Sequence, residues 1–186
     1  MSDLSPTNRI STDRVYDGRI VRVDLDVVEA PDGSEIRLEI VRHPGAAAIV
    51  PLLSAIDAAD PSILLIRQYR YATNGYIWEI PAGVLEPGET PAECASRELL
   101  EEVGATADEI QHLTTIYTTP GFTDEQIHLF LATGISVGDT QHEGDEFIEV
   151  EARPLSHILR MIRDGEIVDS KSISALLFTA GFSLRL

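Results

Sequence analysis

The chain has 186 residues, of which 44% are apolar and 24% charged, as in an ordinary globular protein built around one core. Its net charge of −17, from 31 acidic and 14 basic residues, disfavours binding to long nucleic acids, because such a surface repels a polyphosphate backbone. No apolar run approaches the ~20 residues of a membrane-spanning helix, and residues 1–13 lack the apolar stretch of a secretory signal. The single cysteine, Cys94, excludes an intrachain disulfide. From these absences together we expect a cytoplasmic protein with no membrane partner, and from the charge we expect no nucleic-acid partner.

Alternation of apolar and charged side chains predicts the first two strands. We interpret residues 1–13 as a loose polar arm. Residues 21–27 and 36–40 each alternate with period two, which is typical of half-buried strands. The turn sequence at residues 31–33, Pro-Asp-Gly, lies between them, so the two strands are predicted to form an antiparallel hairpin.

The remaining elements follow from short apolar runs and helical spacing. The expected strands are at 46–53, 63–66, 76–80, 113–118, 126–132 and 147–152, and the expected helices at 91–103, 155–163 and 171–180. Strands and helices are mixed without strict alternation, which indicates an α+β or α-β-α layered domain.

The helix at 91–103 has well-marked ends. Thr90 is a natural N-cap, Pro91 suits the first helical position, Glu93 completes a capping box, and Gly104 is a natural stop. The residues expected on its sheet-facing side are Ala92, Ala95, Leu99 and Val103.

Three carboxylates, Glu98, Glu101 and Glu102, lie near the C-terminal end of this helix. The helix dipole disfavours negative charge there by about 0.3–1 kcal/mol at an exposed position. Glu98 and Glu102 are also four residues apart and repel each other, although Arg97 offsets part of this at Glu101. One interpretation is a solvated acidic helix face. The other is a divalent-cation site, since oxygen ligands in this number suit Mg²⁺ or Mn²⁺.

The segment around this helix resembles the Nudix box, G-x5-E-x7-R-E-U-x-E-E-x-G-U, in which U is a bulky aliphatic residue. The positions that match are Gly83, Glu89, Arg97, Glu98, Leu99, Glu101, Glu102 and Gly104. Ala105 departs from the pattern because it is smaller than the usual aliphatic residue, and this leaves the charged positions untouched. The resemblance implies the Nudix fold, an α+β architecture with a mixed β-sheet sandwiched between α-helices, here with an N-terminal antiparallel hairpin.

The resemblance also implies roles for the box residues. Glu98 and Glu102 are expected to be the main Mg²⁺ ligands, with Glu101 and the backbone carbonyl of Ala82 assisting. Arg97 is expected to hold the glutamates through hydrogen bonds. Glu89 would stabilise the loop, and Gly83 and Gly104 would supply tight backbone geometry. The implied activity is Mg²⁺-dependent hydrolysis of a diphosphate, with Mn²⁺ as a possible substitute.

Three further features resemble the ADP-ribose pyrophosphatase branch of that family. They are Pro120, about fifteen residues past the box, the segments 67–71 and 78–83, and the segment 145–150. The resemblance implies a nucleoside diphosphate sugar as substrate, with ADP-ribose giving AMP and ribose 5-phosphate. Alternatives are another ADP-sugar, GDP-mannose, a dinucleotide or an RNA 5′ end. A non-catalytic ADP-ribose sensor is the alternative of another class, which the retained box glutamates disfavour.

Residues outside the box complete the expected site. Glu146 is the candidate general base, because a carboxylate at a loop-to-strand junction can reach an attacking water. Its rivals are Glu143 and Asp145, and a solvated acidic loop is the alternative. Arg70 is the candidate for gripping a phosphate or the terminal ribose, with a surface ion pair as its alternative.

Arg37 and Arg42 are weaker candidates for the same role as Arg70, and the resemblance implies that Thr119, Gly121 and Glu125 line the substrate pocket. Trp78 either stacks on adenine or packs in the core, and Cys94 is expected to be an inert apolar residue. We expect one Nudix domain over residues 1–186, with its core at 44–186. The hairpin region 14–43 is too small to stand alone, so we expect it to pack on a second subunit in a homodimer.

Overall fold

The computed structural model describes residues 8–138 and 147–184. The chain divides into two compact units. One comprises Met1–Pro44 with Tyr117–Gln126, and the other Gly45–Ile116 with Ile127–Leu186. Each unit is described by itself below.

The first unit is an antiparallel sheet in the order β1-β2-β3, formed by β1 (Arg9–Asp17), β2 (Arg22–Glu29) and β3 (Glu35–Arg42). The predicted hairpin is confirmed as β2 and β3. Its turn contains Gly33 at φ 83°, and the Asp32 carboxylate accepts hydrogen bonds from the backbone N–H and the hydroxyl of Ser34 at 3.0 and 2.6 Å.

The prediction of a loose arm over residues 1–13 is wrong for the described part, because β1 begins at Arg9 and pairs along β2. All nine residues of β1 are exposed. A strand with no buried face needs no alternation of apolar residues, so the signal used to find strands is missing here. Polar pairs across the ladder assist the backbone bonds instead, with Thr12 on Asp26 and Arg14 on Asp24.

The second unit contains a mixed sheet in the order β7-β4-β10-β9. Its strand β4 (Ala46–Pro51) runs parallel to β10 (Gln126–Thr133) and antiparallel to β7 (Ala82–Val84), and β9 (Glu109–Tyr117) completes the order. A second sheet has the order β12-β5-β6. It is formed by β5 (Ser62–Arg70), β6 (Gly75–Glu79) and β12 (Ile148–Pro154), with the 3₁₀ turn Tyr71–Thr73 between β5 and β6. The short strands β8 (Ala105–Thr106) and β11 (Ser136–Val137) pair with each other.

The helices of this unit are α1 (Pro91–Val103), α2 (Leu155–Arg163) and α3 (Ser170–Phe178). Helices α1 and α2 have the predicted bounds, whereas the last residues of the third expected helix belong to a π-helical turn, Thr179–Ser183. The predicted capping box is present at Thr90 and Glu93, and Gly104 ends α1 in the left-handed conformation at φ 68°. The local signals alone therefore define the box helix.

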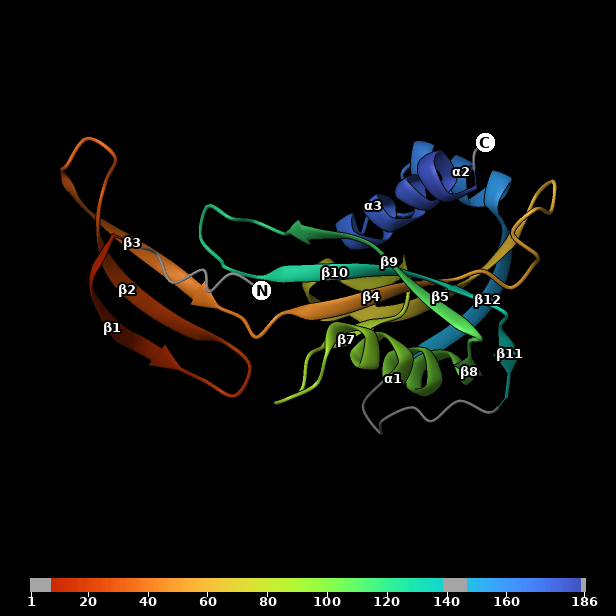
Figure 1. Ribbon diagram of the computed structural model, residues 1–186, viewed down its shortest axis with the longest axis horizontal. Helices are drawn as coiled ribbons and strands as arrows, with labels where there is room; N and C mark the ends of the chain where they lie inside the picture. Colours follow the sequence, from red (N-terminus) through yellow and green to blue (C-terminus); the bar gives the residue numbers. More distant parts are fainter. Residues whose placement is uncertain (1–7, 139–146, 185–186) are drawn as a thin grey trace. The chain divides into compact units, whose positions relative to one another are not determined.

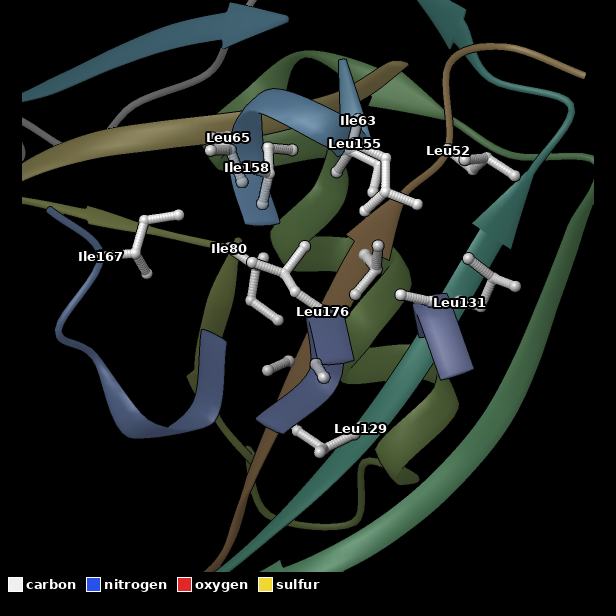
Figure 2. Packing of buried hydrophobic residues seen from close by; sticks show 14 of the residues in the cluster. Leu52, Ile63, Leu65, Ile80, Leu129, Leu131, Leu155, Ile158, Ile167 and Leu176 are labelled. Atoms are coloured by element: carbon white, nitrogen blue, oxygen red, sulfur yellow. The ribbon is translucent and has the colours of Figure 1, made fainter. Parts of the chain in front are cut away.

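Both faces of the central strands are buried, by different helices. Ala46, Ala48 and Val50 of β4 belong to an apolar cluster with residues of α2 and α3, shown in Figure 2. Ala47 and Ile49 belong to a second cluster with the buried residues of α1. Accordingly, α1 lies on one side of β4 and β10, and α2 and α3 lie on the other (Figure 1). The expected α-β-α arrangement is confirmed.

The inward face of α1 differs in one position from the expected set. Ala95, Leu99 and Val103 are buried as predicted, together with Cys94, but Ala92 is exposed in the first turn. Within the two described ranges, no helix combines the length and apolar character needed to cross a membrane.

Candidate active site

The two box carboxylates Glu98 and Glu102 are buried, with 8% and 2% of their surface exposed. They rest against successive residues of β7. The backbone N–H of Ala82 donates to Glu102 Oε2 at 2.9 Å. At the next residue, a Cβ added to Gly83 would lie 1.7 Å from Glu98 Oε1, so the glycine makes the space that this carboxylate fills. A solvated acidic face therefore does not describe these two residues.

Arg97 forms hydrogen bonds with three acidic residues of the box. Its Nε and Nη2 donate to the two oxygens of Glu89 at 2.9 and 3.1 Å. Its Nη1 donates to Glu98 Oε1 at 2.6 Å and to Glu101 Oε2 at 3.0 Å, and Nη2 also reaches the carbonyl of Val84 at 3.2 Å. These bonds, those to Glu89 foremost, raise the pKa of Arg97. One guanidinium thus fixes the direction of three carboxylates, as bidentate geometry allows.

Glu89 closes the loop before the helix. Its Oε2 accepts the backbone N–H of Glu86 at 3.0 Å, while its own N–H donates to the Glu86 carbonyl at 3.0 Å. Arg97 holds the pKa of the Glu89 carboxyl below its usual value. Gly88, at φ 88°, supplies the left-handed turn between them. The loop and the helix are therefore locked together by charge-assisted bonds.

Cys94 is buried beneath this loop, with its Sγ 3.5 Å from the carbonyl oxygen of Gly83. Burial raises the pKa of the thiol to about 12, and the nearby charge of Glu89 acts in the same direction. The expected inert, apolar role agrees with these surroundings.

The residues around Glu98 and Glu102 fit a hard divalent cation. Both side chains offer oxygen ligands beside adjacent residues of β7. Each carboxylate is already oriented by a hydrogen bond, Glu98 by Arg97 and Glu102 by Ala82. Mg²⁺ typically takes one or two carboxylates, several waters and substrate phosphates rather than a full protein cage. Among the described residues no group of three or more His, Cys, Asp or Glu side chains converges. A two-carboxylate site of this kind matches the Mg²⁺ pattern.

Arg70, the expected phosphate-gripping residue, lies in a second charged network. Its Nε and Nη2 donate to the two oxygens of Glu79 at 2.7 and 3.0 Å. Glu79 is only 2% exposed and also binds Lys171, which in turn donates to Asp169 at 3.0 Å. The hydrogen bonds to Glu79 raise the pKa of Arg70 against the effect of burial, and the negative charge of Glu102 contributes to the rise. The charge of one box carboxylate, Glu102, therefore acts on the guanidinium of Arg70.

Sequence reasoning missed Glu79 and Lys171. A signal for Glu79 was available, since a charged residue stands between Trp78 and Ile80 in an otherwise apolar strand, and a buried carboxylate needs partners. Trp78 is partly buried against the apolar cluster of Figure 2, with the Arg153 guanidinium 5.6 Å from its ring centroid. These contacts agree with the interpretation that Trp78 packs in the core.

The other substrate-binding candidates belong to the first unit, in β3 and the segment 117–126. Here the backbone N–H of Val41 donates to the Phe122 carbonyl at 2.7 Å, which attaches that segment to β3. Arg42 donates to Asp24 at 2.9 Å and Asp124 at 3.1 Å and also binds Asp26, so its guanidinium is engaged with three carboxylates.

The same unit has an open pocket of about 420 Å³, lined in part by Arg42, Tyr117, Pro120 and Thr123. Glu125 accepts the hydroxyl of Thr118 at 2.8 Å. Of the other candidates, Gly121 has no atom within 4 Å of an added Cβ, and Arg37 and Thr119 are exposed. Their expected contacts with substrate stay predictions.

The candidate base Glu146 and its rivals Glu143 and Asp145 lie outside the described residues. Their roles also stay predictions. The structure thus gathers Glu89, Arg97, Glu98, Glu101 and Glu102 beside β7, and the charge of Glu102 acts on Arg70.

Comparison with known proteins agrees with this geometry. A NUDIX domain model matches residues 43–176. The methanol dehydrogenase activator of Bacillus methanolicus is 37% identical over 180 residues, covering 96% of this chain and 95% of the relative. The ADP-ribose pyrophosphatase of Bacillus subtilis (strain 168) is 38% identical over 171 residues, covering 91% and 90%. A crystal structure of an ADP compounds hydrolase has the same fold, with a TM-score of 0.78 and 23% identity over 94% of this chain and 92% of that one. The chain belongs to the Nudix family.

Proposed function

We propose that this protein is a Mg²⁺-dependent hydrolase that cleaves the diphosphate of a nucleoside diphosphate sugar. The observation that carries the proposal is the buried pair Glu98 and Glu102, oriented from two sides and set against adjacent residues of β7. Two buried carboxylates so close together repel, and a hard cation turns that repulsion into coordination. The match to the Nudix family supports this use of the pair.

The substrate we propose is ADP-ribose, with AMP and ribose 5-phosphate as products. Support comes from the relative named ADP-ribose pyrophosphatase, which matches over nearly the whole chain, and from Pro120 and the segments 67–71, 78–83 and 145–150. The alternatives are another ADP-sugar, GDP-mannose and a dinucleotide. A non-catalytic ADP-ribose sensor is disfavoured because every charged position of the box is present.

The residues of the box have separate tasks in this proposal. Glu98 and Glu102, with the Ala82 carbonyl and Glu101 assisting, would hold the cation. A bound Mg²⁺ neutralises the diphosphate and acidifies water. Arg97 keeps the Glu98 carboxylate in one direction, and the Ala82 N–H does the same for Glu102. This is the preorganisation on which phosphoryl-transfer enzymes depend.

Residues beyond the box would bind the substrate and move the proton. Glu146 would accept the proton of the attacking water. Arg70, already paired on one edge with Glu79, would offer its positive charge to a phosphate. Thr119, Gly121 and Glu125 would line the substrate pocket.

A panel of nucleoside diphosphate compounds incubated in ¹⁸O water tests the proposal. We expect ADP-ribose to give the highest kcat/KM, with ¹⁸O in AMP or in ribose 5-phosphate marking the phosphorus that is attacked. EDTA should abolish turnover and Mg²⁺ or Mn²⁺ should restore it. Turnover that survives complete chelation would refute the metal role, and a clear preference for GDP-mannose or a dinucleotide would refute the substrate.

We also propose a cytoplasmic homodimer formed through the sheet of β1, β2 and β3. In this unit Ile10, Val15, Tyr16 and Ile20 are each more than half exposed, which is unusual for large apolar side chains gathered on so small a sheet. Covering such side chains with a second copy removes them from water. Light scattering at micromolar concentration should give twice the mass of 20.4 kDa, and a monomer would refute this part.

A further inference from the structure

The N-terminal turn of α3 is tied together by Asp169, its N-cap. Oδ2 of Asp169 accepts the backbone N–H of Ser172 at 2.9 Å, the Ser172 hydroxyl at 2.6 Å and the Lys171 ammonium at 3.0 Å. Because the Ser172 hydroxyl donates its proton to Asp169, its lone pairs are free to accept a bond from elsewhere.

That second bond comes from a segment far away in the sequence. Ser172, which is fully buried, accepts the backbone N–H of Ile80 at 2.9 Å across 92 positions of the chain. Lys171 adds a parallel link, since its ammonium binds the carboxylate of Glu79. The first turn of α3 therefore holds two successive residues, Glu79 and Ile80, by a hydrogen bond and an ion pair.

These two residues lead directly into the support of the box carboxylates. Ile80 is followed by Pro81, whose fixed φ leaves the chain little freedom, and the Pro81 carbonyl accepts the N–H of Ile49 at 2.9 Å. Ala82 comes next and donates to Glu102. A shift at Ile80 is thus passed through one constrained residue, Pro81, to Ala82, the donor that orients Glu102.

Ser172 acts only at a distance, because α3 and α1 cover opposite faces of the central strands (Figure 1). Ile80 itself is part of the apolar cluster on the α3 side, where Figure 2 shows it among the buried residues. The segment 80–82 is therefore held from the α3 side of the central strands, whereas the carboxylate that it supports belongs to α1 on the other side.

We propose that the first turn of α3 is a brace for the cation site, and that Ser172 is a positioning residue acting on Glu102 through the segment 80–82. The inference rests on the proposed function, in which Glu98 and Glu102 bind Mg²⁺. Removing the Ser172 hydroxyl leaves the N–H of Ile80 buried without its acceptor, and the segment relaxes away from the position that serves Glu102.

The test is Mn²⁺ binding to the intact protein, followed by loss of the free-ion electron paramagnetic resonance signal, with no substrate present. For Ser172→Ala we expect Mn²⁺ affinity to fall about three- to ten-fold, at or below the low end for residues that bond metal ligands directly. Ser172→Cys keeps nearly the same volume but accepts hydrogen bonds weakly, and it should show a similar loss. Ser172→Cys also tests the proposal if the alanine variant fails to fold.

Two control variants distinguish the loss of this brace from a general loss of protein stability. Ser174→Ala makes the same substitution two positions along α3, where the hydroxyl bonds the Ser170 carbonyl of its own helix at 2.8 Å and no other group among the described residues. Leu176→Val loosens the packing of the same helix without touching the bonds of Ser172. Both should retain wild-type Mn²⁺ affinity, even where thermal unfolding shows a loss of stability as large as that of Ser172→Ala.

Each result decides the matter. Weakened binding in the Ser172 variants alone supports the brace. Wild-type affinity in Ser172→Ala or Ser172→Cys overturns it, as does an equal loss in Leu176→Val at equal stability. Wild-type protein that binds no Mn²⁺ refutes the proposed function, and the brace with it.

Discussion

Replacing Gly83 by alanine probes the packing of β7 against the box helix. The new Cβ would lie 1.7 Å from Oε1, 2.1 Å from Cδ and 2.8 Å from Oε2 of Glu98. Since non-bonded atoms prefer separations near 3.5 Å, the carboxylate must move by about 1.5 Å or more. Gly83 does not have a positive φ, so alanine fits the backbone, and the strain falls on the flexible end of Glu98.

The expected loss follows from that displacement. Misplacing a reacting or coordinating group by about 1 Å costs roughly 10²-fold in rate. We therefore expect kcat/KM with ADP-ribose to fall about 100-fold, equivalent to ~2.7 kcal/mol of transition-state stabilisation. The melting temperature should change by less than about 4 °C, because the backbone is unstrained and alanine reduces the freedom of the unfolded chain.

Steady-state kinetics with ADP-ribose and Mg²⁺, run beside calorimetric melting, measures both quantities. Gly75→Ala is the matched control, since Gly75 lies in β6 without a positive φ and a Cβ there meets no atom within 4 Å. Wild-type kcat/KM in Gly83→Ala would refute the reasoning, because Glu98 would then tolerate displacement. A collapse of stability in Gly83→Ala would contradict it too.

Three further predictions concern the loop, the thiol and the base. Because Arg97 lowers the pKa of Glu89, their ion pair stabilises the protein fully above the ordinary carboxyl pKa of 4.5, and this stabilisation is lost as the pH falls below that value. The difference in free energy of unfolding between wild type and Glu89→Gln, measured in urea, should therefore shrink from pH 7 to pH 3. A difference that stays constant would contradict this. With its pKa raised to about 12, Cys94 should resist iodoacetamide at pH 8 until the protein unfolds, and rapid labelling of native protein would count against its burial. Glu146→Gln should lower kcat by roughly 10²-fold with KM little changed, and near-normal turnover would transfer the role to Glu143 or to a residue of the box.

The box helix is the part that sequence predicts best, because its information is local. Thr90, Glu93 and Gly104 mark its two ends within a few residues, and the structure has the same bounds. Central strands such as β4 and β10 are also found from sequence, since burial on both faces forces continuous apolar runs. Strand β1 is missed because it has no buried face.

The supports of the site depend on contacts between distant segments, which no local pattern records. Ser172 meets Ile80 across 92 positions, and Lys171 meets Glu79 across the same distance. Arg70 is a sequence candidate because of its guanidinium, but its pairing with the buried Glu79 is seen only in the fold. The chemistry of a residue can be read from its type, whereas the rigidity of its position depends on tertiary neighbours.

The most direct test of the central claim is a crystal structure of the protein with Mn²⁺ and an uncleavable ADP-ribose analogue, using the anomalous signal of manganese to locate the ion. The account predicts a peak in direct contact with carboxylate oxygens of both Glu98 and Glu102 and with the diphosphate of the analogue. A fully bound analogue with no manganese beside these two carboxylates would contradict it.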